Sequence, residues 1–185
     1  YDGIIEYRPK HKVVDVDAAT NTLKFEFNDD LKAAVLNVIP DMRAGDIAVK
    51  TGLATANKRW CEVDFLTFES IAVKNIHVLG DSIQIAPAMP KSGHMANQHG
   101  KTCAAAVVAL LTGKQPNAMP IYNNACYSFV SAEDVVHVSS VHRYDAEKKT
   151  MLPVAGAGGV SSAANELEGR YAMAWARNIW ADTLA

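Results

Sequence analysis

Cysteine is scarce in this chain of 185 residues, which has only Cys61, Cys103 and Cys126, far apart in the sequence. Their odd number and wide spacing fit neither a zinc pattern nor a disulfide framework within the chain. At least one cysteine therefore has no partner here, whatever bridges form. Histidine gives no metal pattern either, because His94 and His99 do not share a helix face as zinc ligands at i and i+4 would.

The chain also lacks an excess of positive charge and a long apolar run. A net charge of −2 and a pI of about 6.3 give no basic face for nucleic acid or an acidic membrane. The longest apolar run, from Cys103 to Leu111, is too short to cross a bilayer. No signal peptide is recognisable, and a start at Tyr1 rather than Met predicts a processed or truncated start.

A glycine-rich dinucleotide fingerprint is missing as well. In AGAGGVSS, residues 155–162, the three glycines do not have the G-x-G-x-x-G spacing, and Pro153 interrupts the preceding run. This stretch is predicted to be a plain flexible loop. The Ser, His and Asp residues form no nucleophile elbow, which argues against a hydrolase.

The composition that remains is that of a globular protein, with 49% hydrophobic and 21% charged residues. Alternating patterns in KVVDVD and TLKFEF predict an antiparallel hairpin, preceded by a short strand in GIIEY. The apolar run Ala34 to Pro40 predicts a strand covered on both faces. One or two helical turns ending at Gly52 should follow.

The rest of the chain mixes strands with two long helices. Two short strands are expected after residue 61, the second from Ile76 to Leu79. A helix is predicted from Ser92, its N-cap, to Leu111. Strands in YNNACYSF and VVHVSSVHRYD precede a C-terminal amphipathic helix with an apolar stripe at four-residue spacing, formed by Leu167, Tyr171, Trp175 and Ile179.

The segment HVLGDS places a carboxylate directly after an apolar strand. In α/β folds a ligand binds beyond the carboxyl ends of the strands, and a carboxylate there accepts hydrogen bonds from a polyhydroxyl chain. Gly80 and Asp81 are therefore candidate binding residues. An ordinary turn at a strand end explains the same pattern equally well.

The predicted helix start at Ser92 and Gly93 strengthens the binding interpretation. Free N–H groups and the positive end of the helix dipole stabilise negative charge, and Gly93 permits close approach. A reduced flavin carries such charge at one ring edge. The alternative is a simple helix cap.

Cys126 lies at a loop-to-strand boundary among polar neighbours. It is either a small buried apolar residue or a redox-active thiol with a partner thiol or a flavin. Cys103, among Ala and Val residues, is predicted to be buried and inert.

Five segments in order resemble the flavoprotein subunit of flavocytochrome c sulfide dehydrogenase: VLNVIPDMRAGDIAVKTGL, WCEVDFLTFES, IHVLGDS, MPKSGHMANQHGK and YNNACYSF. The resemblance is to the C-terminal half of that subunit and is loosest in residues 1–30 and 130–165. It implies an α/β fold, α+β in the C-terminal part. This would be a partial disulfide-reductase-like FAD/NAD(P)-binding fold with a C-terminal interface domain.

The resemblance also implies three regions. Residues 1–60 would end an inserted nucleotide-binding-like domain, residues 61–114 would return to the FAD-binding domain, and residues 115–185 would form the interface domain. The glycine-rich FAD fingerprint would lie in the missing N-terminal half. We therefore expect the isolated chain to be inactive.

Individual positions take roles from the resemblance. Gly80 and Asp81 match the segment that binds the FAD ribityl chain, and the three residues Lys91, Ser92 and Gly93 match the helix start facing the flavin ring. Cys126 matches one cysteine of the redox-active disulfide, whose partner belongs to the missing half. Trp175 matches an aromatic residue near the flavin, with core packing as the alternative. His94 stands where relatives can carry a tyrosine, which leaves an electron-path role there in doubt.

The implied reaction is sulfide oxidation. Sulfide attacks the disulfide that includes Cys126, and electrons pass through FAD to haem on a separate c-type cytochrome subunit. A periplasmic location follows from the resemblance. No metal site and no membrane span are predicted in this chain. The alternatives are a sulfide:quinone oxidoreductase, which would need an amphipathic membrane anchor, and a non-catalytic cytochrome-binding domain.

Overall fold

The computed structural model describes residues 3–184 and divides into two compact units, Tyr1–Asp41 and Met42–Ala185. The smaller unit is an antiparallel sheet in the order β1-β2-β3, formed by Val13–Asp17, Thr22–Phe25 and Leu31–Lys32. The predicted hairpin is confirmed. Its turn is held by Asp17 Oδ1, which accepts from the N–H groups of Ala19 and Thr20.

Two predicted strands in this unit are wrong. Residues 3–7 and the run Ala34 to Pro40 are irregular, and Val35 and Ile39 are 84% and 86% exposed. An apolar run becomes a buried strand only when neighbouring strands pair with it. No strand of the described residues pairs with residues 34–40.

The larger unit begins with the predicted short helix, α1, Asp46–Lys50, and Gly52 follows it with a φ of +76°. Ala44, Ala48 and Cys61 form a small buried cluster beneath it. Residues 61–83 are connected by isolated bridges rather than strands. The strand predicted over Ile76–Leu79 is therefore wrong, because that segment forms a single bridge, from His77 to Glu69.

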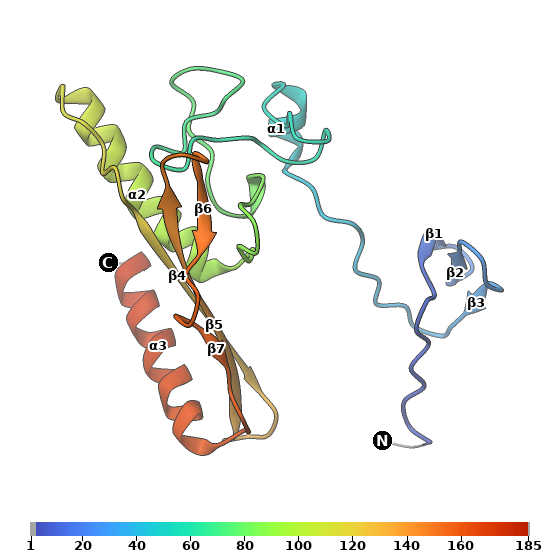
Figure 1. The fold of residues 1–185 in the computed structure, drawn as a ribbon. Coiled ribbons are helices and arrows are strands. Elements are labelled where there is room, and N and C mark those ends of the chain that lie inside the picture. The colour runs from blue at the N-terminus through green and yellow to red at the C-terminus, as the bar shows by residue number, and fades with distance from the viewer. Residues whose placement is uncertain (1–2, 185) are drawn as a thin grey trace. The chain divides into compact units, whose positions relative to one another are not determined.

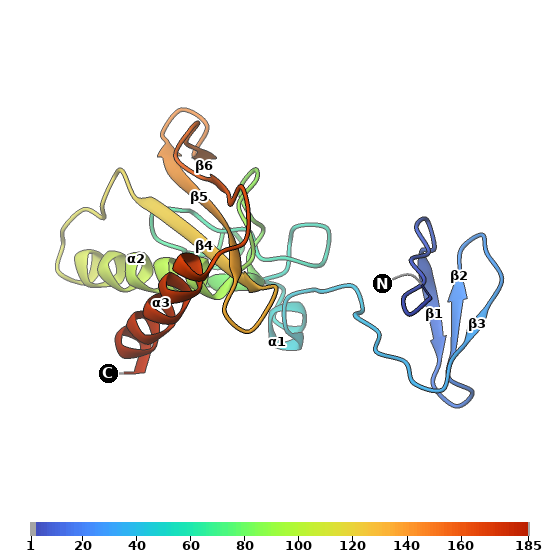
Figure 2. The same ribbon diagram turned by 90° about the horizontal axis from the view of Figure 1, so that it is seen from below.

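A 3-10 turn, η1, Gly80–Ser82, leads toward the long helix α2, Gly93–Leu111, which is capped by Ser92 as predicted. The chain then forms β4, Ile121–Phe129, β5, Val135–Asp145, and β6, Thr150–Pro153, with β7, Gly159–Val160, also paired to β5. All these pairings are antiparallel, and β5 lies between β4 and β6 (Figure 2). Part of the glycine-rich stretch predicted to be a loop is thus a strand.

The main core lies between α2, the 61–89 segment and the sheet. Its largest fully buried side chains include Phe68, Ile83, Met95, Tyr122 and Met151. Tyr122 donates its hydroxyl to the Phe65 carbonyl at 2.6 Å, so the sheet is bonded directly to the 61–89 segment. Cys103 is buried in this core as predicted.

The last helix, α3, Glu166–Leu184, starts beside the β4–β5 turn and runs back along the hairpin (Figure 1). Its buried face is not the predicted stripe. Leu167 and Tyr171 are about half exposed, whereas Gly169 and Ala172 are buried. The small residues face inward because a helix can approach a sheet closely only where side chains are short. Trp175 and Ile179 lie on the inner side as expected.

The mixed class is confirmed: the described residues combine helices with antiparallel sheets, α+β in the C-terminal part. The domain boundaries at residues 60 and 114 stay a prediction. No helix among residues 3–184 has the length and apolar character needed to cross a membrane.

Candidate functional site

A cavity of about 330 Å³ lies where the start of α2, strand β4 and helix α3 meet. It brings together four residues predicted from the sequence, Ser92, Gly93, Cys126 and Trp175. Its walls are completed by His94 and Ala125, by Tyr127 and Phe129 of β4, and by Ala172, Met173 and Ala176 of α3. The predicted residues are far apart in sequence, so their convergence is a property of the fold.

The start of α2 forms one wall of the cavity. Ser92 Oγ accepts from the Met95 N–H at 3.1 Å, and the Ser92 carbonyl accepts from Ala96 N–H. The N–H groups of Gly93 and His94 precede the intrahelical pattern. A Cβ at Gly93 would have no heavy atom within 4 Å. The first N–H groups of α2 and the positive end of its dipole therefore lie at this wall, and Gly93 leaves space beside them.

Strand β4 presents Cys126 beside a polar neighbour. Ser92 Oγ donates to Asn124 Oδ1 at 2.5 Å, which fixes Asn124 against the helix start. Asn124 Nδ2 lies 3.4 Å from Cys126 Sγ. Cys126 is half-buried, and all three cysteines are free thiols, with Cys61 and Cys103 buried elsewhere. The Cys126 thiol can in turn donate to Asn124 Oδ1, which lies 3.7 Å away.

His94 closes the free edge of β4. Its Nδ1 accepts from the Ala125 N–H at 3.0 Å, so a neutral ring carries its proton on Nε2. Burial, and then the charge of Lys101, lower the pKa of His94. The ring packs edge-on against Trp175, with centroids 5.6 Å apart. His94 thus covers an exposed strand edge and positions the aromatic wall at once.

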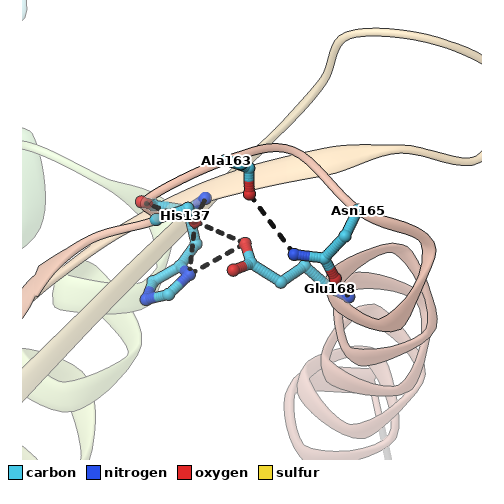
Figure 3. Close-up of polar contacts among 5 residues, drawn as sticks. His137, Ala163, Asn165 and Glu168 are labelled. Carbon is cyan, nitrogen blue, oxygen red and sulfur yellow. Dashed lines mark hydrogen bonds and ion pairs between the residues drawn. The ribbon is translucent and has the colours of Figure 1, made fainter.

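Polar contacts fix the position of α3, which carries Trp175. Glu168 Oε2 bonds His137 Nδ1 of β5 at 2.9 Å and accepts from Ser161 Oγ at 2.5 Å (Figure 3). These bonds, from Ser161 first and then from His137, lower the pKa of Glu168. Asn165 caps the helix by accepting from the Glu168 N–H at 3.0 Å.

The contacts of Glu168 with His137 and Ser161 anchor the start of α3, and a row of aromatic rings runs from this anchor into the cavity. Tyr127 lies 6.1 Å from the His137 ring and 5.8 Å from Trp175 between centroids. The anchor at the start of α3 and the cavity wall therefore belong to one packed assembly. Trp175 thus packs against the rings of His94 and Tyr127 and lines the cavity, and its place beside a flavin stays a prediction.

The other predicted binding residues form a second group, outside the cavity lining. Asp81 is exposed on η1 and does not follow a sheet strand, contrary to the expected crevice beyond a parallel sheet. Lys91 Nζ donates to the carbonyls of Asp81 and Ile83 at 2.6 and 2.8 Å. It also lies 3.7 Å from the Trp60 ring centroid. Its ammonium group therefore supports the turn and is not directed at the start of α2.

Sequence reasoning missed Asn124, Tyr127 and the cavity-forming role of His94. Tyr127 and Cys126 are adjacent in sequence, but nothing in the pattern indicated that Trp175 would pack against the tyrosine. Asn124 had a weak signal, since a polar residue at a buried strand position needs a partner. That partner, Ser92, is 32 positions away.

The cavity has the features that a flavin ring edge requires. Its lining is mostly apolar and aromatic, N–H groups of a helix start lie at one wall, and a thiol lies on the neighbouring wall formed by β4. The residues present therefore fit a flavin. Among residues 3–184 no three His, Cys, Asp or Glu side chains lie close enough to hold a metal ion.

Residues 118–184 match the family described as flavocytochrome c sulphide dehydrogenase, flavin-binding. The matched segment contains Cys126, Tyr127 and Trp175 and comprises the sheet together with α3. It confirms the predicted resemblance over these residues. For the remainder of the chain the resemblance stays a prediction.

Proposed function

We propose that this chain forms part of the FAD site of a sulfide dehydrogenase that passes electrons to a c-type cytochrome subunit. The observation that carries the proposal is the convergence of Cys126, the α2 start and Trp175 on one cavity, two of whose walls lie within the matched segment. When bound, FAD would supply the two-electron acceptor. The Gly93 and His94 N–H groups would favour negative charge at its ring edge.

Cys126 is the residue proposed to react with sulfide. It would form a disulfide with a cysteine outside this chain, as the resemblance implies. Attack by HS⁻ forms a new S–S bond to one cysteine as the protein disulfide breaks, and the other cysteine leaves as thiolate with the bonding electron pair. Asn124 Nδ2 lies 3.4 Å from the Cys126 sulfur and would donate a hydrogen bond to it.

Gly80 and Asp81 are proposed to hold the ribityl chain of FAD. No described residue donates a hydrogen bond to the Asp81 carboxylate, which is exposed and available to ligand hydroxyls. Lys91 would act here through the carbonyls of the turn. The proposal also includes two partners, the N-terminal half of the same subunit and a cytochrome subunit that carries haem. It places the protein in the periplasm.

The test is the visible spectrum of the full-length gene product before and after anaerobic sulfide. We expect flavin bands that bleach in the wild type and fail to bleach in Cys126→Ser. Cys103→Ala is the matched control, because Cys103 lies in the core and should leave bleaching intact.

Two results would contradict the proposal. A purified full-length protein without flavin bands would rule out flavin binding. Unchanged bleaching in Cys126→Ser would show that the Cys126 thiol takes no part in the reaction, although flavin is bound.

A further inference from the structure

His99 is a buried polar residue that the proposed reaction does not use. It lies on α2, is 2% exposed, and packs between the rings of Phe68 and Tyr122, with centroids at 4.6 and 5.2 Å. No described residue bonds its Nε2. A buried N–H without a partner is unfavourable, so a purely apolar ring would suit this place better.

The other nitrogen of His99 has a defined partner. Nδ1 accepts from the Gly80 N–H at 3.3 Å, and Gly80 is itself buried at the first position of η1. Burial, and then the charge of Lys91, lower the pKa of His99 to about 4. The ring is therefore neutral near pH 7, and Nδ1 remains an acceptor.

The Gly80 turn is tightly constrained against α2. Its φ is +69°, and a Cβ on Gly80 would lie 3.3 Å from Ala96 Cβ, one helical turn before His99. Lys91 binds the carbonyl of the next residue, Asp81, at 2.6 Å. The peptide unit that precedes Gly80 is thus held by His99, and the one that follows Asp81 by Lys91.

We propose that His99 is a positioning residue, which fixes the Gly80–Asp81 turn through its Nδ1 so that the Asp81 carboxylate is oriented to bind the flavin's hydroxylated chain. The inference rests on the proposed function. It explains why an imidazole occupies a site whose packing alone favours an apolar ring, since phenylalanine would fill the same space and offer no acceptor to Gly80.

Two substitutions separate packing from the hydrogen bond. His99→Phe keeps an aromatic ring between Phe68 and Tyr122 and removes the acceptor. His99→Asn places Oδ1 where Nδ1 stood and removes most of the ring. Packing loss should make the asparagine variant the less stable of the two. The phenylalanine variant should stay closer to wild type, because removal of the unpaired Nε2–H offsets the Gly80 N–H that it leaves without an acceptor.

Two measurements on the full-length protein follow. The first is hydrogen exchange of the Gly80 amide, which should accelerate in His99→Phe and stay protected in His99→Asn. The second is the dissociation constant for FAD. We expect about threefold to tenfold weaker binding in His99→Phe, the effect of one hydrogen bond, and recovery toward wild type in His99→Asn.

The outcomes are distinguishable. Weaker FAD binding in the phenylalanine variant with recovery in the asparagine variant supports the inference. Two results overturn the inference and leave the proposed function standing. One is wild-type affinity for FAD in His99→Phe. The other is a loss of FAD affinity that parallels the loss of stability and is therefore greater in His99→Asn. A wild-type protein that binds no FAD overturns the proposed function, and this inference with it.

Discussion

At the level of single residues, two glycines near the proposed flavin site differ in backbone conformation and in the space around them. Gly80 adopts a left-handed φ of +69° with Ala96 Cβ close by, whereas Gly93 has open space and an ordinary φ. An L side chain is strained at the first position and tolerated at the second. Gly80 is thus required by the turn, whereas the structure around Gly93 leaves room for a side chain.

We predict that Gly80→Ala lowers the free energy of unfolding by about 1–2 kcal/mol, because alanine resists the positive φ and crowds Ala96. Urea denaturation followed by circular dichroism measures this. Gly93→Ala is the control and should change stability by less than about 0.5 kcal/mol. Equal effects of the two substitutions would argue against a strained turn at Gly80.

At the level of elements, α3 is held by one close approach and one polar anchor. A Cβ on Gly169 would overlap the carbonyl oxygen of Glu133 in the β4–β5 turn. Glu168, one residue earlier, bonds His137 and Ser161. Both contacts lie at the start of the helix, and Trp175 is carried less than two turns beyond.

Gly169→Ala should separate α3 from the hairpin turn and destabilise the protein by about 2 kcal/mol or more, since backbone cannot move aside as a side chain can. Gly100→Ala in the middle of α2 should instead stabilise by up to about 1 kcal/mol, because its Cβ would meet no atom within 4 Å. Thermal unfolding of both variants checks the opposite signs. A neutral Gly169→Ala would show that α3 is not in close contact with the turn.

Glu168→Gln should make stability less dependent on pH. The pKa of Glu168 is lowered by Ser161 and His137, so its contribution is present above the unfolded value of 4.5 and is lost as pH falls through the lower, folded value. The variant should be less stable than wild type at pH 7, and the difference should shrink near pH 3. Glu166→Gln, in the same helical turn, is the control in parallel urea titrations at both pH values. An equal change of stability with pH in the two variants would show that the contacts of Glu168 do not stabilise the start of α3.

For the molecule as a whole, acid stability depends on histidines that are buried in the neutral form. The pKa values of His94, His99 and His142 are all lowered, chiefly by burial. A group whose folded pKa lies below its unfolded value takes up protons preferentially in the unfolded chain. Its contribution is therefore complete above about pH 6.5 and is lost as the pH falls toward the folded pKa.

We predict that the free energy of unfolding falls between pH 7 and pH 4.5, with His99 alone accounting for a loss on the order of 2 kcal/mol. Guanidinium denaturation across this range measures the fall. His99→Phe should make the curve shallower, because it removes the largest of these shifts. A stability curve that is flat down to pH 4.5 would show that the histidines are accessible to protons in the folded state.

The sequence by itself determined what local chemistry controls. The β1–β2 hairpin, α1 with Gly52, and α2 with its Ser92 cap follow from alternation, helix propensity and capping, which act over a few residues. The candidate binding residues around Ser92 and Cys126 stay a prediction, made from a helix start and from a family resemblance that the match confirms over residues 118–184 alone.

Only the tertiary structure decided which apolar segments are buried and which residues meet. Residues 34–40 have the composition of a core strand, but no strand within residues 3–184 pairs with them. Leu167 and Tyr171 lie outside because Gly169 and Ala172 allow the closer approach. The pairing of Ser92 with Asn124, and of His99 with Gly80, joins positions 32 and 19 residues apart. Burial and long-range contact are properties of the packed chain, and no local pattern contains them.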